Sequence, residues 1–273
     1  MRVGNKLVIS FVVCFLVTLS SSLCFAGGQA TREMTLEQKV QRSLDYQEIQ
    51  NVMSKHEYYH ALTLNNQELD DLWVKKTPNP TFAQNQGYWI GYKSIRYYYG
   101  TLNEMMKQSS LNAICRNNPN IKNTKENLAM GTMMMHTLTT PIIVVAGDGK
   151  TAKGMWYSPG QVTMVGPDGK GMASWIWEKY GADFVKEDGQ WKIWHLHMYT
   201  DFMTPVGESW VKTTKDAPVG SEGSQPKPDD GGIAMPKPDK EEITYKTYSP
   251  TQVPQNAPRM PEPYWTFSET FSY

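Results

Sequence analysis

The sequence predicts an α+β fold in which helices pack on one face of a strongly curved antiparallel sheet. Two observations lead to this prediction. Apolar residues recur at spacings of three and four over residues 35–64 and 92–114, as on amphipathic helices. From residue 128 to residue 200 the pattern becomes that of strands separated by glycine-containing turns. Helices followed by long strands are expected to enclose a conical cavity between the two layers.

The helical part is expected to begin at Thr35, which forms a capping box with Gln38. The apolar spacing slips by one residue between Leu44 and Ile49, which indicates either a bend or a break between two helices. A short helix is predicted over residues 67–75, before prolines interrupt it, and another helix over residues 92–114.

The strand part is expected to contain a short strand or pair of strands over residues 81–90 and a long strand over 128–145 that pairs with 151–157. Further strands are predicted at 162–165, 171–185 and 191–200. Strict alternation in the last strand assigns Trp191, Ile193, His195, His197 and Tyr199 to one face and Trp194, Leu196 and Met198 to the other. Both faces are rich in apolar residues, so we expect helices on one side and a partner subunit or loop on the other.

The two ends of the chain differ from this body. Residues 1–26 have a basic start, an apolar run and a small residue at Ala26, which predicts a signal peptide and an exported, periplasmic or secreted, protein. Residues 211–244 are a Pro/Gly-rich linker by composition. Residues 245–273 are too aromatic for a free tail, and we expect them to dock on the body or on a neighbouring subunit.

Composition excludes several classes of protein. The net charge is zero, and it becomes −2 once Arg2 and Lys6 leave with the signal peptide, so nucleic acid is not an expected partner. The apolar run at the N-terminus is too short for stable membrane insertion. Only Cys115 remains after cleavage, which rules out an internal disulfide in the mature chain. Phosphate-binding glycine loops, nucleophile elbows and paired Cys-x-x-Cys motifs are absent from the sequence.

His136 is the first candidate for chemistry, because it interrupts an apolar strand and an imidazole there can face a pocket. The alternative is a core histidine bonded to a backbone carbonyl. His195 and His197 could join it in a three-histidine metal site, but no carboxylate is spaced with them, and we expect no metal.

Five segments resemble a known family: residues 49–52, 61–62, 87–95, the strand around His136, and 188–207. Together they are similar to the SnoaL-like branch of the nuclear transport factor 2-like superfamily over about residues 40–207, which places a SnoaL-like domain at 35–210. The resemblance implies a cystatin-like cone. It also implies a homo-oligomer, trimer or dimer, because dehydrochlorinase-like members are trimers and other members are dimers.

The resemblance further implies a pocket that works without a cofactor. In the dehydrochlorinase, scytalone dehydratase and bile-acid dehydratase members, a strand histidine removes a proton and an aspartate of the first helix stabilises it. His136 matches that histidine and is expected to be the general base, whereas Thr63 stands at the position of the aspartate. The acidic residues that could approach His136 instead are Glu57, Asp70, Asp71 and Asp201. Substrate-binding positions are assigned to Tyr59, His60, Trp89, Tyr99, Trp156 and His197.

Two functions follow from this resemblance. The first is a cofactor-independent lyase or isomerase, of the dehydratase type, that acts on a hydrophobic cyclic small molecule. The alternative is a small-molecule binding protein that retains the pocket and lacks the catalytic aspartate.

Overall fold

The computed structural model describes residues 34–213, 233 and 236–273. The predicted signal peptide and most of the predicted linker lie outside these residues. The helical layer contains α1 (Leu36–Ala61), α2 (Asn65–Leu72), α3 (Tyr92–Ile95), the π-helical turn η1 (Arg96–Thr101) and α4 (Leu102–Asn117). Short helical turns occur at η2 (Lys125–Asn127), α5 (Trp210–Thr213) and η4 (Phe267–Glu269).

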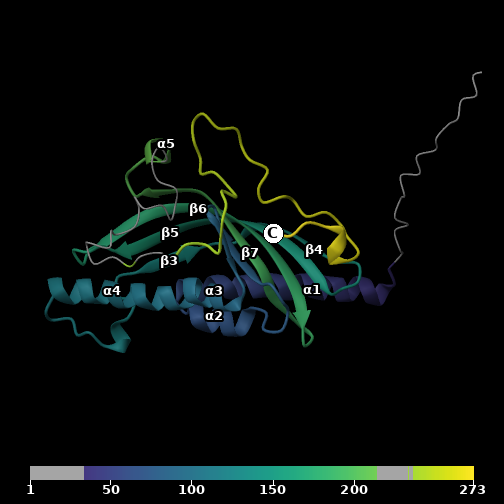
Figure 1. Cartoon of the computed structure of the whole chain (residues 1–273), viewed down its shortest axis with the longest axis horizontal. Coiled ribbons are helices and arrows are strands. Elements are labelled where there is room, and N and C mark those ends of the chain that lie inside the picture. The colour runs from purple at the N-terminus through teal and green to yellow at the C-terminus, as the bar shows by residue number, and fades with distance from the viewer. Residues whose placement is uncertain (1–33, 214–232, 234–235) are drawn as a thin grey trace, which may run out of the picture.

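One sheet of eight strands forms the second layer. Its strands are β1 (Thr81–Gln84), β2 (Gly87–Ile90), β3 (Met133–His136), β4 (Thr139–Val145), β5 (Thr151–Val165), β6 (Gly171–Glu187), β7 (Gln190–Pro205) and β8 (Lys240–Glu241). The order is β3-β5-β6-β7-β1-β2-β8, and β4 pairs with β5 beyond the end of β3. The pairs are antiparallel except for β1 and β7, which run parallel. Helices α1 to α4 lie along one face of the sheet, and the C-terminal segment lies over the opposite face (Figure 1).

The predicted α+β class and its helix-on-sheet layers are present. The first helix is one continuous α1 with the predicted Thr35–Gln38 capping box. The slip in its apolar spacing does not mark a break. Leu36, Val40 and Leu44 are exposed in the first turns of α1, and the buried stripe begins only at Asp45 and Ile49.

The predicted helix over 92–114 and three predicted strands are divided or joined differently in the structure. A π-helical turn interrupts the helix, and one extra residue in such a turn lets the adjacent Tyr98 and Tyr99 both face the core. The predicted strand 128–145 splits into β3 and β4, which both pair with β5. The predicted strands 151–157 and 162–165 are a single β5 that continues through Pro159.

The predicted assignment of faces in β7 is wrong after Ile193. The register shifts where Ile193 pairs with Phe184 and His195 pairs with Asp183, so Trp194 is an extra residue. Such a β-bulge moves the side chains that follow it to the other face, here as far as the second bulge at Asp201. Leu196 and Met198 therefore join Trp191 and Ile193 in the core under the helices.

The C-terminal segment covers the outer face of β5, β6 and β7. Its backbone bonds to the β4–β5 turn through Tyr264 and Trp265, and the backbone N–H of Tyr273 donates to Asp183 at 2.9 Å. Lys153 is fully buried beneath it, paired with Asp183 at 2.5 Å. Four aromatic rings surround the ammonium group of Lys153: Tyr264, Phe267, Phe271 and Tyr273. The C-terminal segment, which we expected to dock on the body or on a neighbouring subunit, thus lies on the outer face of the same chain.

Candidate active site

Ionisable side chains meet on the inner face of the sheet, at the point where α1 and α2 cross it. Strand alternation directs one residue of β3, one of β5, two of β6 and one of β7 inward, and the helices contribute the rest. We call this group the inner cluster: His56, Glu57, His60, Glu68, Tyr99, His136, Ser158, Glu178, Tyr180 and Thr200. A concentration of charge-bearing groups on a face that is otherwise core is costly unless the groups are paired or neutral.

One pair in the inner cluster is a buried ion pair. Nδ1 of His56 lies 2.7 Å from Oε1 of Glu68, and both side chains are inaccessible to solvent. Burial alone lowers the pKa of His56, but the attraction of Glu68 and its hydrogen bond, with Glu57 and Glu178 beyond, outweigh burial and raise it to about 9. His56 is therefore a cation at neutral pH.

The tautomer of His60 follows from its neighbours. The hydroxyl group of Tyr99 donates its proton to Oε2 of Glu68 at 3.0 Å. The hydroxyl oxygen of Tyr99 therefore accepts the hydrogen bond from Nδ1 of His60, also at 3.0 Å. Burial and the nearby His136 and His56 lower the pKa of His60. His60 is thus neutral, and its Nε2 carries the lone pair.

His136 is buried, 8% exposed, and neither ring nitrogen has a hydrogen-bond partner among the described residues. Its Nδ1 lies 3.4 Å from Oε2 of Glu178, which is within reach of an ion pair but longer than a good hydrogen bond. Burial, and then the positive His56, lower the pKa of His136 to about 4. The imidazole is a neutral base beside a carboxyl group that can stabilise its protonated form.

Two carboxyl groups of the inner cluster titrate near neutrality. Burial raises the pKa of Glu178 to about 7, although Thr200 donates to its Oε1 at 2.9 Å. Burial also raises the pKa of Glu57 to about 7, and neither of its oxygens has a hydrogen-bond partner among the described residues. Carboxyl groups poised in this range are typical of acid–base sites.

Close strand packing holds His136 in place. Gly160 is opposite His136 in the β3–β5 ladder. A Cβ atom at this position would lie 3.1 Å from Nδ1 of His136 and would collide with the carbonyl oxygen of Met135. The absence of a side chain at Gly160 therefore lets β3 lie against β5 with the imidazole turned inward.

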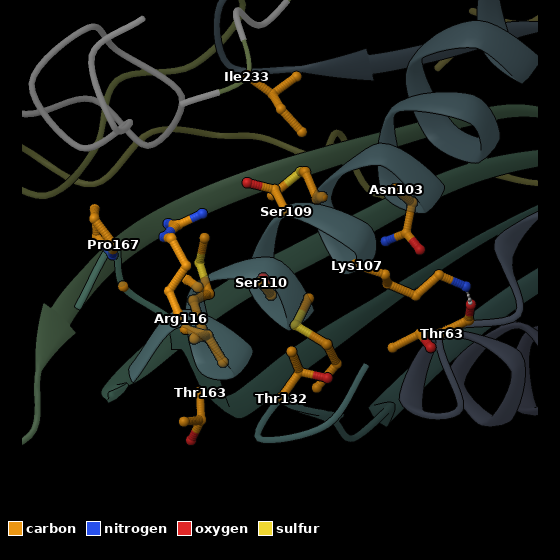
Figure 2. A pocket seen from close by; sticks show the side chains of 16 residues that line it. Thr63, Asn103, Lys107, Ser109, Ser110, Arg116, Thr132, Thr163, Pro167 and Ile233 are labelled. Atoms are coloured by element: carbon orange, nitrogen blue, oxygen red, sulfur yellow. Dashed lines mark hydrogen bonds between the residues drawn. The ribbon is translucent and has the colours of Figure 1, made fainter. Parts of the chain in front are cut away.

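A cavity of about 150 Å³ lies along α4, and its lining residues do not include members of the inner cluster. Thr63 and Met134 line it, and they stand three residues from His60 and two residues from His136. Figure 2 shows Thr63, Asn103 and Lys107 at one end of the cavity and Arg116 and Pro167 at the other. The remaining lining residues are Met106, Ser109, Ser110, Ala113, Thr132, Thr163, Met164, Val165, Gly166 and Ile233.

The structure brings His60, Tyr99 and His136 together, and it separates them from other predicted site residues. Thr63 lines the cavity, and its carbonyl accepts from Lys107 at 2.9 Å, but the carboxyl group beside His136 comes from Glu178. Tyr59 is directed to α2, where its hydroxyl donates to Asp71 at 2.5 Å.

Three predicted substrate-binding residues lie away from the inner cluster. Trp89 stacks on Tyr98 in the core, with ring centroids 3.8 Å apart. Trp156 is fully buried and donates to Gln50 at 3.0 Å. His197 lies on the outer face, because the bulge at Trp194 reverses the faces of β7. There its Nε2 is hydrogen-bonded to the hydroxyl of Thr244 at 2.9 Å. His197 therefore does not share a cavity with His136.

The sequence reasoning missed Glu178, Glu68, His56 and Tyr180, and it named Glu57 only as one of several possible acids. A signal was available for Glu178. It interrupts the inward series Ile176, Tyr180, Ala182 and Phe184 on β6 at an even position, so alternation alone assigns it to the buried face.

The histidines of β7 form a separate group on the outer face. Oδ2 of Asp183 lies 2.8 Å from Nδ1 of His195, and Oγ of Ser272 lies 2.9 Å from the same nitrogen. In a serine nucleophile relay, the hydroxyl and the carboxylate meet different ring nitrogens. This arrangement therefore indicates a structural contact. In the described part of the chain, no three His, Cys, Asp or Glu side chains are grouped so that they could hold a metal ion.

Comparison with solved structures gives distant likenesses. A hexachlorocyclohexane dehydrochlorinase, LinA type 2, has 13% identity and a TM-score of 0.44, and the match covers 67% of this chain and 99% of that one. A nuclear transport factor 2-like protein from Salmonella enterica has 18% identity and a TM-score of 0.41, with coverage of 62% and 99%. A search of curated proteins returned no match.

A family model gives the assignment. The model of the SnoaL-like domain matches residues 41–197, more than half of the chain. That span includes every residue of the inner cluster except Thr200. The chain belongs to the SnoaL-like domain family.

Proposed function

We propose that this protein is a cofactor-independent lyase or isomerase that moves a proton on a hydrophobic cyclic small molecule, with His136 as general base. The observation that carries the proposal is the neutral imidazole of His136, which has no hydrogen-bond partner among the described residues and lies 3.4 Å from a carboxyl group that titrates near pH 7. Membership of the SnoaL-like family, whose domains bind small molecules, supports the same class of reaction.

The chemical step uses the two ring nitrogens differently. With its Nδ1–H directed to ionised Glu178, His136 presents the Nε2 lone pair to the substrate. Nε2 takes a proton from a substrate carbon, the C–H electron pair forms a double bond to the neighbouring carbon, and the leaving group departs with its own bonding pair. Glu178 stabilises the imidazolium, which returns its proton to the leaving group or to solvent. General base catalysis of this kind contributes about 10²–10⁴-fold in rate.

The test compares two buried histidines on opposite faces of one sheet. Halogenated and hydroxylated ring compounds are incubated in deuterated buffer, and proton NMR follows loss of the leaving group and deuterium incorporation. We expect His136→Gln to lose about 10²-fold or more in turnover. His197→Gln, the matched control on the outer face, should retain turnover. Equal rates for wild type and His136→Gln would overturn the proposal.

The alternative, a binding protein without chemistry, is distinguished by the same compounds. It requires that ring compounds bind to the wild type and remain unchanged on prolonged incubation. The specific observation in its favour is Thr63, which lines the cavity where the resemblance predicts an acid.

We also propose that the chain is exported and that it assembles as a dimer or trimer. The basis for export is the pattern of residues 1–26, and a mature protein that begins at Gly27 would support it. No helix among the described residues has the length and apolarity to cross a membrane. The mass in solution, measured by light scattering, tests the assembly, and a monomer would contradict it.

A further inference from the structure

One end of the cavity along α4 carries a cation, Arg116, that has no acidic partner among the described residues. Arg116 lies at the end of α4, is exposed at its surface, and makes no ion pair within the described residues. Lys107, the other cation of the lining, is different. Its ammonium group lies 2.6 Å from Oε1 of Glu104 and donates to the carbonyl of Thr63 at 2.9 Å. The net positive charge of the lining is therefore at the Arg116 end.

The acidic residue next to Pro167 in the sequence already interacts with another residue. Asp168 follows Pro167, which lines the cavity, and its Oδ1 accepts the backbone N–H of Lys170 at 3.1 Å. Its Oδ2 lies 3.7 Å from the ammonium group of Lys170. With respect to the described residues, the guanidinium of Arg116 thus keeps its planar set of donors available for an anion that comes from solution.

The wall between the two ends is largely apolar. Met106 and Ala113 face it from α4, and Met134 and Val165 face it from the strands. Nine residues of helix separate Lys107 from Arg116, which corresponds to about 13 Å along the helix axis. A ligand that spans this distance would have its anionic group at Arg116 and its other end beside Thr63, whose backbone N–H donates to the carbonyl of His60 in the inner cluster.

We propose that the cavity binds an amphipathic organic anion, with a carboxylate or similar planar anionic group on Arg116 and an apolar ring body along Met106, Ala113 and Met134. This assignment names the substrate class of the proposed function. It rests on the proposed function in one respect, which is that the cavity is taken to be the substrate site. A planar carboxylate matches the donor fork of a guanidinium, and a methionine-rich wall accommodates ring compounds of differing outline.

The experiment uses two probes of nearly the same shape, the anion 2-naphthoate and the neutral 2-naphthamide. The full chain is labelled at the methionine methyl groups with ¹³C, and Met106, Met134 and Met164 report on the cavity that they line. We expect naphthoate to shift these three signals and to bind more tightly than naphthamide. Arg116→Gln should weaken naphthoate binding about tenfold, to the level of naphthamide, and leave naphthamide unaffected. Lys55→Gln, which removes an exposed cation of α1, is the matched control and should change neither affinity.

Several results would overturn the inference. They are absence of binding by both probes, equal affinity for both, an Arg116→Gln variant that weakens both alike or neither, and binding that leaves the three methionine signals unmoved. His136→Gln should retain naphthoate binding, so the two proposals fail separately. If His136→Gln keeps full turnover while naphthoate binding still depends on Arg116, the proposed function is wrong and the anion site stands.

Discussion

Glu57 gives the sharpest prediction about the inner cluster. Its carboxyl group is buried, and burial raises its pKa from 4.5 to about 7. Between these two values the folded chain holds a proton that the unfolded chain has released. The free energy of unfolding therefore falls as the pH rises from about 4.5 to about 7, and a shift of this size corresponds to about 3 kcal/mol.

Replacing Glu57 by Gln removes this titration and keeps the shape of the protonated group. Urea unfolding, followed by tryptophan fluorescence, measures both proteins from about pH 4.5 to about pH 8. Relative to wild type, Glu57→Gln should gain about 3 kcal/mol over that interval. Glu48→Gln changes an exposed carboxyl group on the same helix and should run parallel to wild type. A Glu57→Gln profile that also runs parallel would refute the reasoning.

Three further predictions concern the neighbourhood of His136 and the outer face. Turnover should rise about tenfold per pH unit up to about pH 7, because ionised Glu178 stabilises the imidazolium of His136. The Glu178→Gln variant should lack the inflection near pH 7. A wild-type profile that is flat from about pH 5 to about pH 8 would contradict this prediction. Gly160→Ala should lower the free energy of unfolding by about 1–3 kcal/mol and shift the His136 ring resonances, and unchanged resonances would contradict the packing argument. Lys153→Met should lower the free energy of unfolding in urea by about 3–5 kcal/mol, because it leaves the buried Asp183 without its ammonium partner. Combining Lys153→Met with Asp183→Leu should recover part of that loss. A double variant that recovers nothing would argue against the ion pair.

The sequence was sufficient for the class of fold and for the order of its elements. Helical spacing, the capping box at Thr35 and the glycine turns each reflect local geometry, which a single segment can encode. The faces of β7 could not be predicted, because the bulge at Trp194 depends on pairing with β6. The π-helical turn before α4 escaped prediction for a similar reason, since its extra residue is accommodated by packing against α2 and β1.

The candidate site was predictable only in part. His136, His60 and Tyr99 were named as site residues from the resemblance and from the elements that carry them, and the structure places their rings close together. The carboxyl partner of His136 was expected on α1 or nearby, but Glu178 comes from β6, 42 residues along the chain. A long-range pair of this kind is set by strand register, which one sequence does not reveal. His197 was assigned to the pocket by the same alternation that the bulge interrupts.

The charge states of the histidines test the account most directly, because they need no substrate. The chain has five histidines, so NMR of protein labelled with ¹³C at histidine Cε1 gives few signals, and His→Gln variants assign them. We predict that His136 stays neutral down to a pH of about 4, while His56 stays protonated up to a pH of about 9. A His136 that titrates near its ordinary value of 6.5, or a His56 that is neutral at pH 7, would contradict the central claim that the inner cluster holds a neutral base beside a buried cation.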